Sequence, residues 1–203
     1  ARVSALLGEK DVMLGAIGHD LKTPLAALRV RIESVEDDAE RGRMAESIDE
    51  MVGILDDILM LARLGRSGEE MRRTDLAALA ETVVEEFVDR GGAVTLSESA
   101  VPVATALRPV LVRRALRNLI GNALKYGGAA RVTVLREGVD TLVRIEDDGP
   151  GIDPARIEAM FEPFARAEAS RNRATGGSGL GLTIARAIAR AHGGTVTLTN
   201  RVG

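Results

Sequence analysis

Residues 18–25 read GHDLKTPL and lie inside a regular pattern of apolar residues. An apolar residue recurs every seven positions around this stretch, and others fall between at helical spacing. The recurring positions are Leu7, Leu14, Leu21, Leu28 and Val35, joined by Ile17, Leu25 and Ile32. We therefore expect a long helix. Pro24 breaks the local rule within it, because proline removes a helical hydrogen bond, and such breaks often mark functional sites.

A second apolar stripe follows, so residues 1 to about 65 are expected to be helical. The polar residues 36–42 are expected to form the turn between the two helices. Two helices alone cannot bury stripes this wide, but a symmetric dimer that closes a four-helix bundle would. A coiled coil without chemistry is the alternative. The second stripe consists of Met44, Ile48, Met51, Leu55, Ile58 and Ala62.

The composition is that of a globular protein and limits the partners it can have. Of the 203 residues, 45% are hydrophobic and 28% charged, and the formal net charge of −3 argues against nucleic acid or an anionic membrane as the main partner. The chain has no cysteine, which excludes disulfides and thiolate metal sites. Because it begins within a helical pattern and stops just past a strand-like run, we expect a fragment of a longer protein.

After a glycine-containing break at residues 65–68, helical and strand-like segments alternate. This order predicts an α+β protein, in which an antiparallel helical hairpin precedes an α/β sandwich with helices on one face of a mixed sheet. The domain boundary is expected between residues 66 and 67. Helices are expected from Thr74 or Asp75 to about Arg90, from Arg108 to about Tyr126 and from about Gly179 to about His192. Strands are expected at residues 93–96, 103–107, 131–136, 141–146 and 195–199.

The two histidines of the chain have different surroundings. His19 lies between apolar positions and is expected near the hairpin surface, where a neutral imidazole can attack phosphorus if its other nitrogen is held. Asp20 could hold that N–H, and Thr23, one turn further, could orient a water. A solvated histidine–aspartate pair is the alternative reading of this stretch alone. His192 is expected to end a helix and to have no catalytic role.

Three later stretches have features of a nucleotide site. Asn118 and Asn122 share one helical face, where an amide oxygen suits Mg²⁺, and Lys125 follows to meet phosphate charge. Residues 146–152, EDDGPGI, place carboxylates at a tight turn, and one of them could accept the amine of adenine. Residues 176–182, GGSGLGL, open a helix whose N-terminus would bind phosphate. Taken singly, each stretch also fits a cap, a turn or a glycine-rich loop.

Taken together and in this order, these stretches resemble motifs of the sensor histidine kinases of bacterial two-component systems. The resemblance spans essentially the whole chain. It implies a dimerisation and histidine phosphotransfer domain, residues 1–66, followed by a Bergerat-type catalytic ATP-binding domain, residues 67–203. The phosphoacceptor box resembles His19–Leu25, the N box Asn118–Tyr126, the first glycine box Asp147–Gly151, the F box Phe161–Phe164, and the second glycine box Gly177–Leu182.

The resemblance also implies residue roles. His19 would be phosphorylated with Asp20 as its acid–base neighbour, and Asp20 and Thr23 resemble the pair that dephosphorylates the partner regulator. Asn122 would hold Mg²⁺, and Asp147 would bind adenine. The residues implied to bind ATP are Asn118, Asn122, Lys125, Tyr126, Asp147, Gly149, Gly151, Ile152, Phe161, Phe164, Arg166, Gly177, Gly179, Leu180 and Gly181.

The implied partners are a second copy of the chain and the receiver domain of a response regulator. The resemblance further implies the cytoplasmic portion of a membrane-anchored bacterial inner-membrane protein, with the sensor, membrane span and last sheet strand of the family outside this sequence. Two alternatives are weighed. An ATPase of the same nucleotide fold would lack the motif at residues 19–24. A degenerate scaffold would not need His19, Asn122 and Asp147 together.

Overall fold

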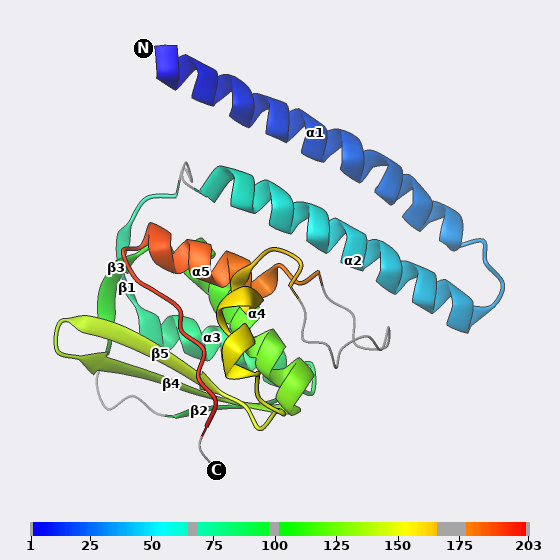
Figure 1. Cartoon of the computed structure of the whole chain (residues 1–203). Helices are drawn as coiled ribbons and strands as arrows, with labels where there is room; N and C mark the ends of the chain where they lie inside the picture. The colour runs from blue at the N-terminus through cyan, green and yellow to red at the C-terminus, as the bar shows by residue number, and fades with distance from the viewer. Residues whose placement is uncertain (1, 65–68, 98–101, 166–177, 202–203) are drawn as a thin grey trace. The chain divides into compact units, whose positions relative to one another are not determined.

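The computed structural model describes residues 2–64, 69–97, 102–165 and 178–201 (Figure 1). The chain divides into two compact units, a helical hairpin and an α/β unit. The predicted α+β class is therefore confirmed. The break predicted at residues 65–68 lies outside the described residues, so the boundary between residues 66 and 67 stays a prediction.

The hairpin consists of α1 (Arg2–Ile32) and α2 (Asp38–Arg63). Helix α1 continues through Pro24. The turn expected at residues 36–42 is wrong in its bounds, since residues 38–42 already belong to α2. The reason is a helix cap: the Asp37 carboxylate accepts the N–H of Glu40 at 2.8 Å, and acidic residues in the first turn suit the helix dipole.

The two helices approach closely beside His19. Gly18 is buried, and a Cβ atom at that position would lie 2.5 Å from Cδ1 of Leu59 on α2. Further along, the Lys22 ammonium is 2.6 Å from the Asp56 carboxylate. A side chain larger than glycine would therefore push α2 away. Gly18 thus allows the two helices to pack closely next to His19.

The α/β unit contains two sheets. Strands β1 and β3 pair antiparallel, while β2, β4 and β5 form a mixed sheet in which β2–β4 is parallel and β4–β5 antiparallel. The predicted mixed sheet is thus confirmed. The elements are β1 (Arg72–Asp75), α3 (Leu76–Val88), β2 (Ala93–Ser97), β3 (Ala104–Leu107), α4 (Pro109–Gly127), β4 (Ala129–Glu137), β5 (Asp140–Glu146), two short 3-10 helices (Pro154–Arg156 and Glu158–Phe161) and α5 (Gly181–Ala191).

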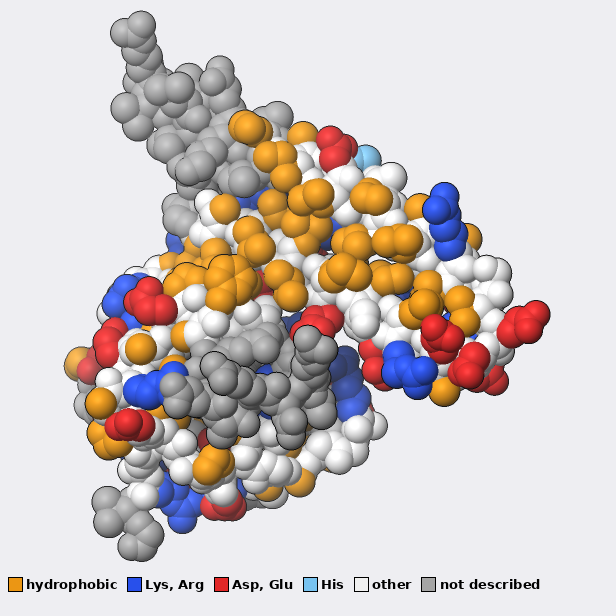
Figure 2. All heavy atoms as spheres, turned by 45° about the vertical axis from the view of Figure 1, so that its right-hand side comes forward, with side chains coloured by type: hydrophobic (Ala, Val, Ile, Leu, Met, Phe, Trp, Pro, Cys, Tyr) orange, Lys and Arg blue, Asp and Glu red, His pale blue; other side chains and the backbone are white. Residues whose placement is uncertain are grey.

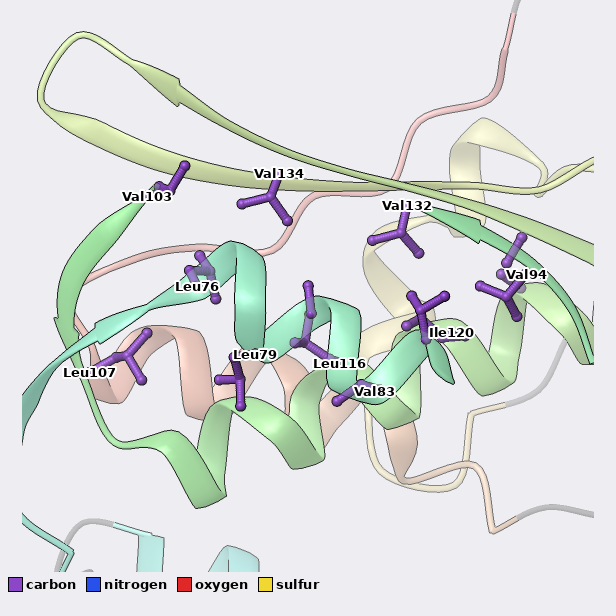
Figure 3. Packing of buried hydrophobic residues seen from close by; sticks show 14 residues of the cluster. Leu76, Leu79, Val83, Val94, Val103, Leu107, Leu116, Ile120, Val132 and Val134 are labelled. Atoms are coloured by element: carbon purple, nitrogen blue, oxygen red, sulfur yellow. The ribbon is translucent and has the colours of Figure 1, made fainter. Parts of the chain in front are cut away.

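The core of this unit lies between the three-stranded sheet and helices α3 and α4. Figure 3 shows Val83 of α3 and Ile120 of α4 beneath Val132 of β4, and all three have no exposed surface. Alternate residues of β4 are buried, as the period of two along a strand requires. Aliphatic packing on one face of the sheet therefore holds α4, the helix that carries both asparagines.

Two strand assignments differ from the sequence-based expectation. Residues 195–199 were expected to form a strand, but the structure assigns none there. Val196 and Leu198 are half-buried and the threonines that alternate with them are exposed, as the alternating sequence predicts. The segment nevertheless lacks the regular backbone hydrogen bonds that define a strand. Strand β1 was not expected, because its sequence RRTD has no apolar alternation and it forms by pairing with β3.

His192 ends α5, as the sequence predicts, and Gly193 follows with φ +74°. Nδ1 of its ring is 2.7 Å from the carbonyl oxygen of Ile188, and Nε2 accepts the backbone N–H of Arg108 at 3.0 Å. This pattern requires a neutral ring with the proton on Nδ1. Both ring nitrogens are therefore engaged, and His192 joins the end of α5 to the start of α4.

Candidate functional site

His19 stands on the exposed side of α1. Its side chain is 81% exposed and that of Asp20 is 79% exposed, and Nδ1 of the ring lies 3.3 Å from Oδ1 of the carboxylate. An ionised carboxylate only accepts, so the proton of a neutral ring is placed on Nδ1. Nε2 then keeps its lone pair and faces solvent. This is the arrangement of a nitrogen nucleophile with its second nitrogen held.

Thr23 lies one turn further along α1. Its hydroxyl donates to the carbonyl oxygen of His19 at 3.0 Å. Pro24 has no N–H, so the helical bond that would reach the Asp20 carbonyl is missing. The Thr23 hydroxyl proton is therefore used within the helix, while its oxygen can still accept from a water. Whether it positions such a water stays a prediction.

The asparagine pair of α4 meets the start of α5. A Cβ atom on Gly181 would lie 3.6 Å from Cβ of Asn118 and 3.6 Å from Nδ2 of Asn122. The structure thus brings together two motifs that are about 60 residues apart. Nδ2 of Asn118 is buried without a hydrogen-bond partner among the described residues. This amide nitrogen can therefore donate a hydrogen bond to a group that lies at the start of α5.

The N-terminus of α5 is positioned by an uncommon backbone contact. Gly179 has φ +70°, and a Cβ atom there would lie 2.9 Å from Cα of Phe164, whose N–H donates to the Gly179 carbonyl at 3.1 Å. Leu180 is buried, and no side chain in the described part of the chain caps the helix. The N-terminus of α5 therefore lies beside the asparagine pair, and the N–H groups and dipole of a helix N-terminus favour an anion.

The turn after β5 packs on the end of α4. The carboxylate of Asp147 accepts the N–H of Gly149 through Oδ1 at 2.8 Å, which fixes its orientation. A Cβ atom on Gly127 would lie 2.6 Å from Cβ of Asp147, and one on Gly149 would lie 3.1 Å from the carbonyl oxygen of Tyr126. Only glycine fits at both positions, so the two segments approach closely enough to present Asp147 beside Tyr126.

The neighbouring carboxylate, Asp148, has a different use. The Arg131 guanidinium makes two hydrogen bonds to it, at 2.8 and 2.7 Å, and holds the pKa of Asp148 below its usual value, with Arg201 3.4 Å away adding to the effect. A carboxylate engaged in this way is a structural group. Of the two aspartates, Asp147 is therefore the one able to meet a ligand.

Two further predicted contacts flank this turn and the start of α5. Nζ of Lys125 lies 4.8 Å from the centroid of the Tyr126 ring, a cation–π distance. Phe161 is only 2% exposed, and its ring packs under the Arg186 guanidinium at 4.7 Å. Its predicted contact with a nucleotide stays a prediction, because the buried ring supports the site by packing here. Phe164 is exposed.

Two of the predicted site residues, Arg166 and Gly177, fall outside the described residues. Their roles therefore remain predictions. Gly151 has φ +73° and precedes Ile152, whose backbone is bound by Asn200. Sequence reasoning missed Asn200 and Arg131, because neither belongs to a glycine-rich or carboxylate motif.

The site fits Mg²⁺ when the ion is carried by phosphate. Among the described residues, no group of three or more histidine, cysteine, aspartate or glutamate side chains could hold a metal. Asn122 offers one neutral amide oxygen close to the start of α5, where the Asn118 amide also lies. Mg²⁺ commonly takes few protein ligands and keeps substrate phosphates and water in its shell. The residues present therefore fit an ion that takes most of its ligands from phosphate oxygens and water.

Both units contain segments that match known protein families. Residues 107–203 match the family described as histidine kinase-, DNA gyrase B-, and HSP90-like ATPase, and residues 9–67 match the His Kinase A (phospho-acceptor) domain. The α/β unit thus belongs to the class of ATPases that these three groups share. No described helix is long and apolar enough to cross a membrane.

Individual relatives agree with this assignment. Sensor histidine kinase GtrS of Pseudomonas aeruginosa is 35% identical over 98% of this chain and 41% of its own length, and sensor protein RstB of Escherichia coli is 36% identical over 96% and 46%. Full-length ShkA, solved in complex with AMPPNP, is 25% identical with a TM-score of 0.72, covering 96% of this chain and 44% of that one. The chain therefore belongs to the sensor histidine kinases of bacterial two-component systems. It spans less than half the length of these relatives.

Proposed function

We propose that this chain is an ATP-dependent protein-histidine autokinase that phosphorylates His19. Residues 1–66 would be the dimerisation and phosphotransfer domain and residues 67–203 the catalytic domain. The observation that carries the proposal is the N-terminus of α5 beside the buried Asn118 amide nitrogen, neither of which has a side-chain partner among the described residues. An anion-binding helix end next to amide ligands is suited to the phosphates of a nucleotide.

Different residues would bind the base and the phosphates of the nucleotide. Oδ1 of Asp147 is held by Gly149, which leaves Oδ2 to accept the exocyclic amine of adenine. The phosphates would lie at the N-terminus of α5, where Gly181 lets them approach Asn118 and Asn122. Mg²⁺, bound through Asn122 and the phosphates, would neutralise charge on the transferred group.

At His19 the chemistry is a single substitution at phosphorus. Nε2 attacks the γ-phosphorus of ATP, the bond from that phosphorus to the β–γ bridging oxygen breaks, and ADP leaves. The proton stays on Nδ1, and the Asp20 carboxylate stabilises the positive charge that develops on the ring. The phosphoryl group would then pass to an aspartate of a response regulator receiver domain. Asp20 and Thr23 would also take part in the opposing activity, in which water removes the phosphoryl group from that regulator.

We further propose that the functional unit is a homodimer formed by the hairpin. Figure 2 shows hydrophobic side chains gathered along the hairpin surface, and the exposed ones include Leu21, Leu28, Val30 and Met51. Apolar surface of this extent on two helices is typical of an interface. The whole protein would be a membrane-anchored bacterial sensor whose cytoplasmic portion contains this chain.

The dimer is tested by sedimentation of the whole chain at tens of micromolar. Leu28→Glu should raise the dimer dissociation constant by at least about tenfold, because each protomer would place a charge where an apolar side chain is buried on association. Val139→Glu is the matched control: Val139 is equally apolar and 89% exposed, but it lies in the β4–β5 turn. A wild-type chain that sediments as a monomer would contradict the proposal.

The nucleotide assignment is tested by labelling and by base preference. Incubation with γ-labelled Mg-ATP should give a label that acid removes and base does not, as expected of a phosphoramidate. Asp147→Asn replaces one acceptor oxygen with a donor, so it should reduce the preference for ATP over GTP by roughly tenfold, about the effect of one hydrogen bond. Calorimetry with both nucleotides measures this. Asp148→Asn is the comparison variant, which should leave the preference unchanged.

A further inference from the structure

We infer that Asn200 is a positioning residue for the nucleotide. Its carboxamide binds both backbone groups of Ile152: Oδ1 accepts the Ile152 N–H at 2.9 Å, and Nδ2 donates to the Ile152 carbonyl at 2.6 Å. One side chain thus satisfies a donor and an acceptor of the same residue, as a neighbouring strand would. The inference rests on the proposed function, because it concerns the turn that carries Asp147.

The contact reaches further than Ile152. Gly151 has φ +73°, and a Cβ atom there would lie 3.0 Å from Oδ1 of Asn200. The amide therefore lies against the turn at the point where only glycine leaves room for it. The next residue, Arg201, lies 3.4 Å from Asp148 at the other end of the same turn.

Residues 147–152 are therefore held at both ends by the segment that follows α5. Residues 195–201 form no strand, so no regular backbone ladder joins this segment to β5, and side chains supply the attachment. The two Asn200 bonds, at 2.9 and 2.6 Å, are shorter than the Arg201 contact at 3.4 Å and are therefore the stronger part of the attachment. Without them the turn would sample more conformations in the free protein, and binding would have to order it.

The expected result is a loss of affinity without a loss of chemistry. Asn200→Ala should raise the dissociation constant for Mg-ADP by roughly 10- to 30-fold, as expected when two hydrogen bonds of about 1 kcal/mol each no longer preorganise the turn. The KM for ATP in autophosphorylation should rise in parallel, while kcat at saturating ATP stays within about twofold. Hydrogen exchange at the Ile152 amide should accelerate in the absence of nucleotide.

Three comparisons make the experiment decisive. Thr199→Ala changes the adjacent exposed residue and should leave affinity and exchange unchanged. Asn200→Asp keeps the acceptor for the Ile152 N–H but loses the donor, so it should weaken Mg-ADP as Asn200→Ala does; it gives a second reading if the alanine variant folds poorly. Wild-type protein that fails to bind Mg-ADP would refute the proposed function instead. Asn200 variants with faster Ile152 exchange but unchanged affinity, or with unchanged exchange, would overturn the inference.

Discussion

The His19→Gln protein is expected to take up no label from γ-labelled Mg-ATP. Glutamine has no ring nitrogen with a free lone pair, so the attacking atom is lost while the size and polarity of an exposed side chain are largely kept. The measurement is acid-labile, base-stable label on the protein over time, with nucleotide affinity measured in parallel. Affinity for Mg-ADP should be unchanged, which separates the loss of the acceptor from damage to the nucleotide site.

The only other histidine supplies the matched control. Both ring nitrogens of His192 are engaged with backbone groups, so this ring offers no nucleophile. His192→Gln can still accept the Arg108 N–H through its amide oxygen and should retain most labelling. If label persisted in His19→Gln and disappeared in His192→Gln, the assignment of the phosphoacceptor would be reversed.

The second large effect separates two activities that use one helical surface. Asp20→Asn should slow the labelling of His19 by about 10²–10⁴-fold, because the amide no longer carries the charge that supports a positive imidazole ring. Thr23→Ala should keep most labelling, since the nucleophile is the ring nitrogen. It should reduce dephosphorylation of a phosphorylated receiver domain by roughly 10²-fold, because that reaction requires an aligned water. Both rates are measured for both variants.

The hydrogen bond from Thr23 to the His19 carbonyl supplies a control for this experiment. Thr23→Ser keeps the hydroxyl and should keep both activities. Equal loss of both activities in a folded Thr23→Ala protein would show that the hydroxyl is needed only to support the helix next to Pro24.

Local sequence patterns predicted most of the fold, because helix periodicity and caps are local properties. The end of α4 near Tyr126 and the start of α3 after Asp75 are examples: the Asp75 carboxylate accepts the N–H of Ala77 at 3.0 Å, as a cap should. The two strand errors have one cause. Charged β1 forms because β3 pairs with it, while the alternating residues 195–199 lack such a ladder. Pairing is a long-range property that alternation alone does not report.

The candidate site shows the same division. Asn118, Asn122 and Asp147 could be chosen from the sequence because their spacing or their turn is local. The residues that hold the turn around Asp147 could not be chosen in this way. Asn200 binds Ile152, 48 residues away in the sequence, and Arg131 binds Asp148, 17 residues away. The burial of the Asn118 amide nitrogen also required the structure, since burial depends on which residues of α5 pack against it.

The placement of Tyr126 gives this protein a built-in optical reporter. The chain contains one tyrosine and no tryptophan, so its ultraviolet emission comes almost entirely from that one ring. Tyr126 is 42% exposed, lies under Lys125 and adjoins the turn that bears Asp147. A ligand that stacks on the ring or withdraws Lys125 from it would change that emission. Binding at this site can therefore be followed in the unmodified protein, with no added dye and no engineered residue.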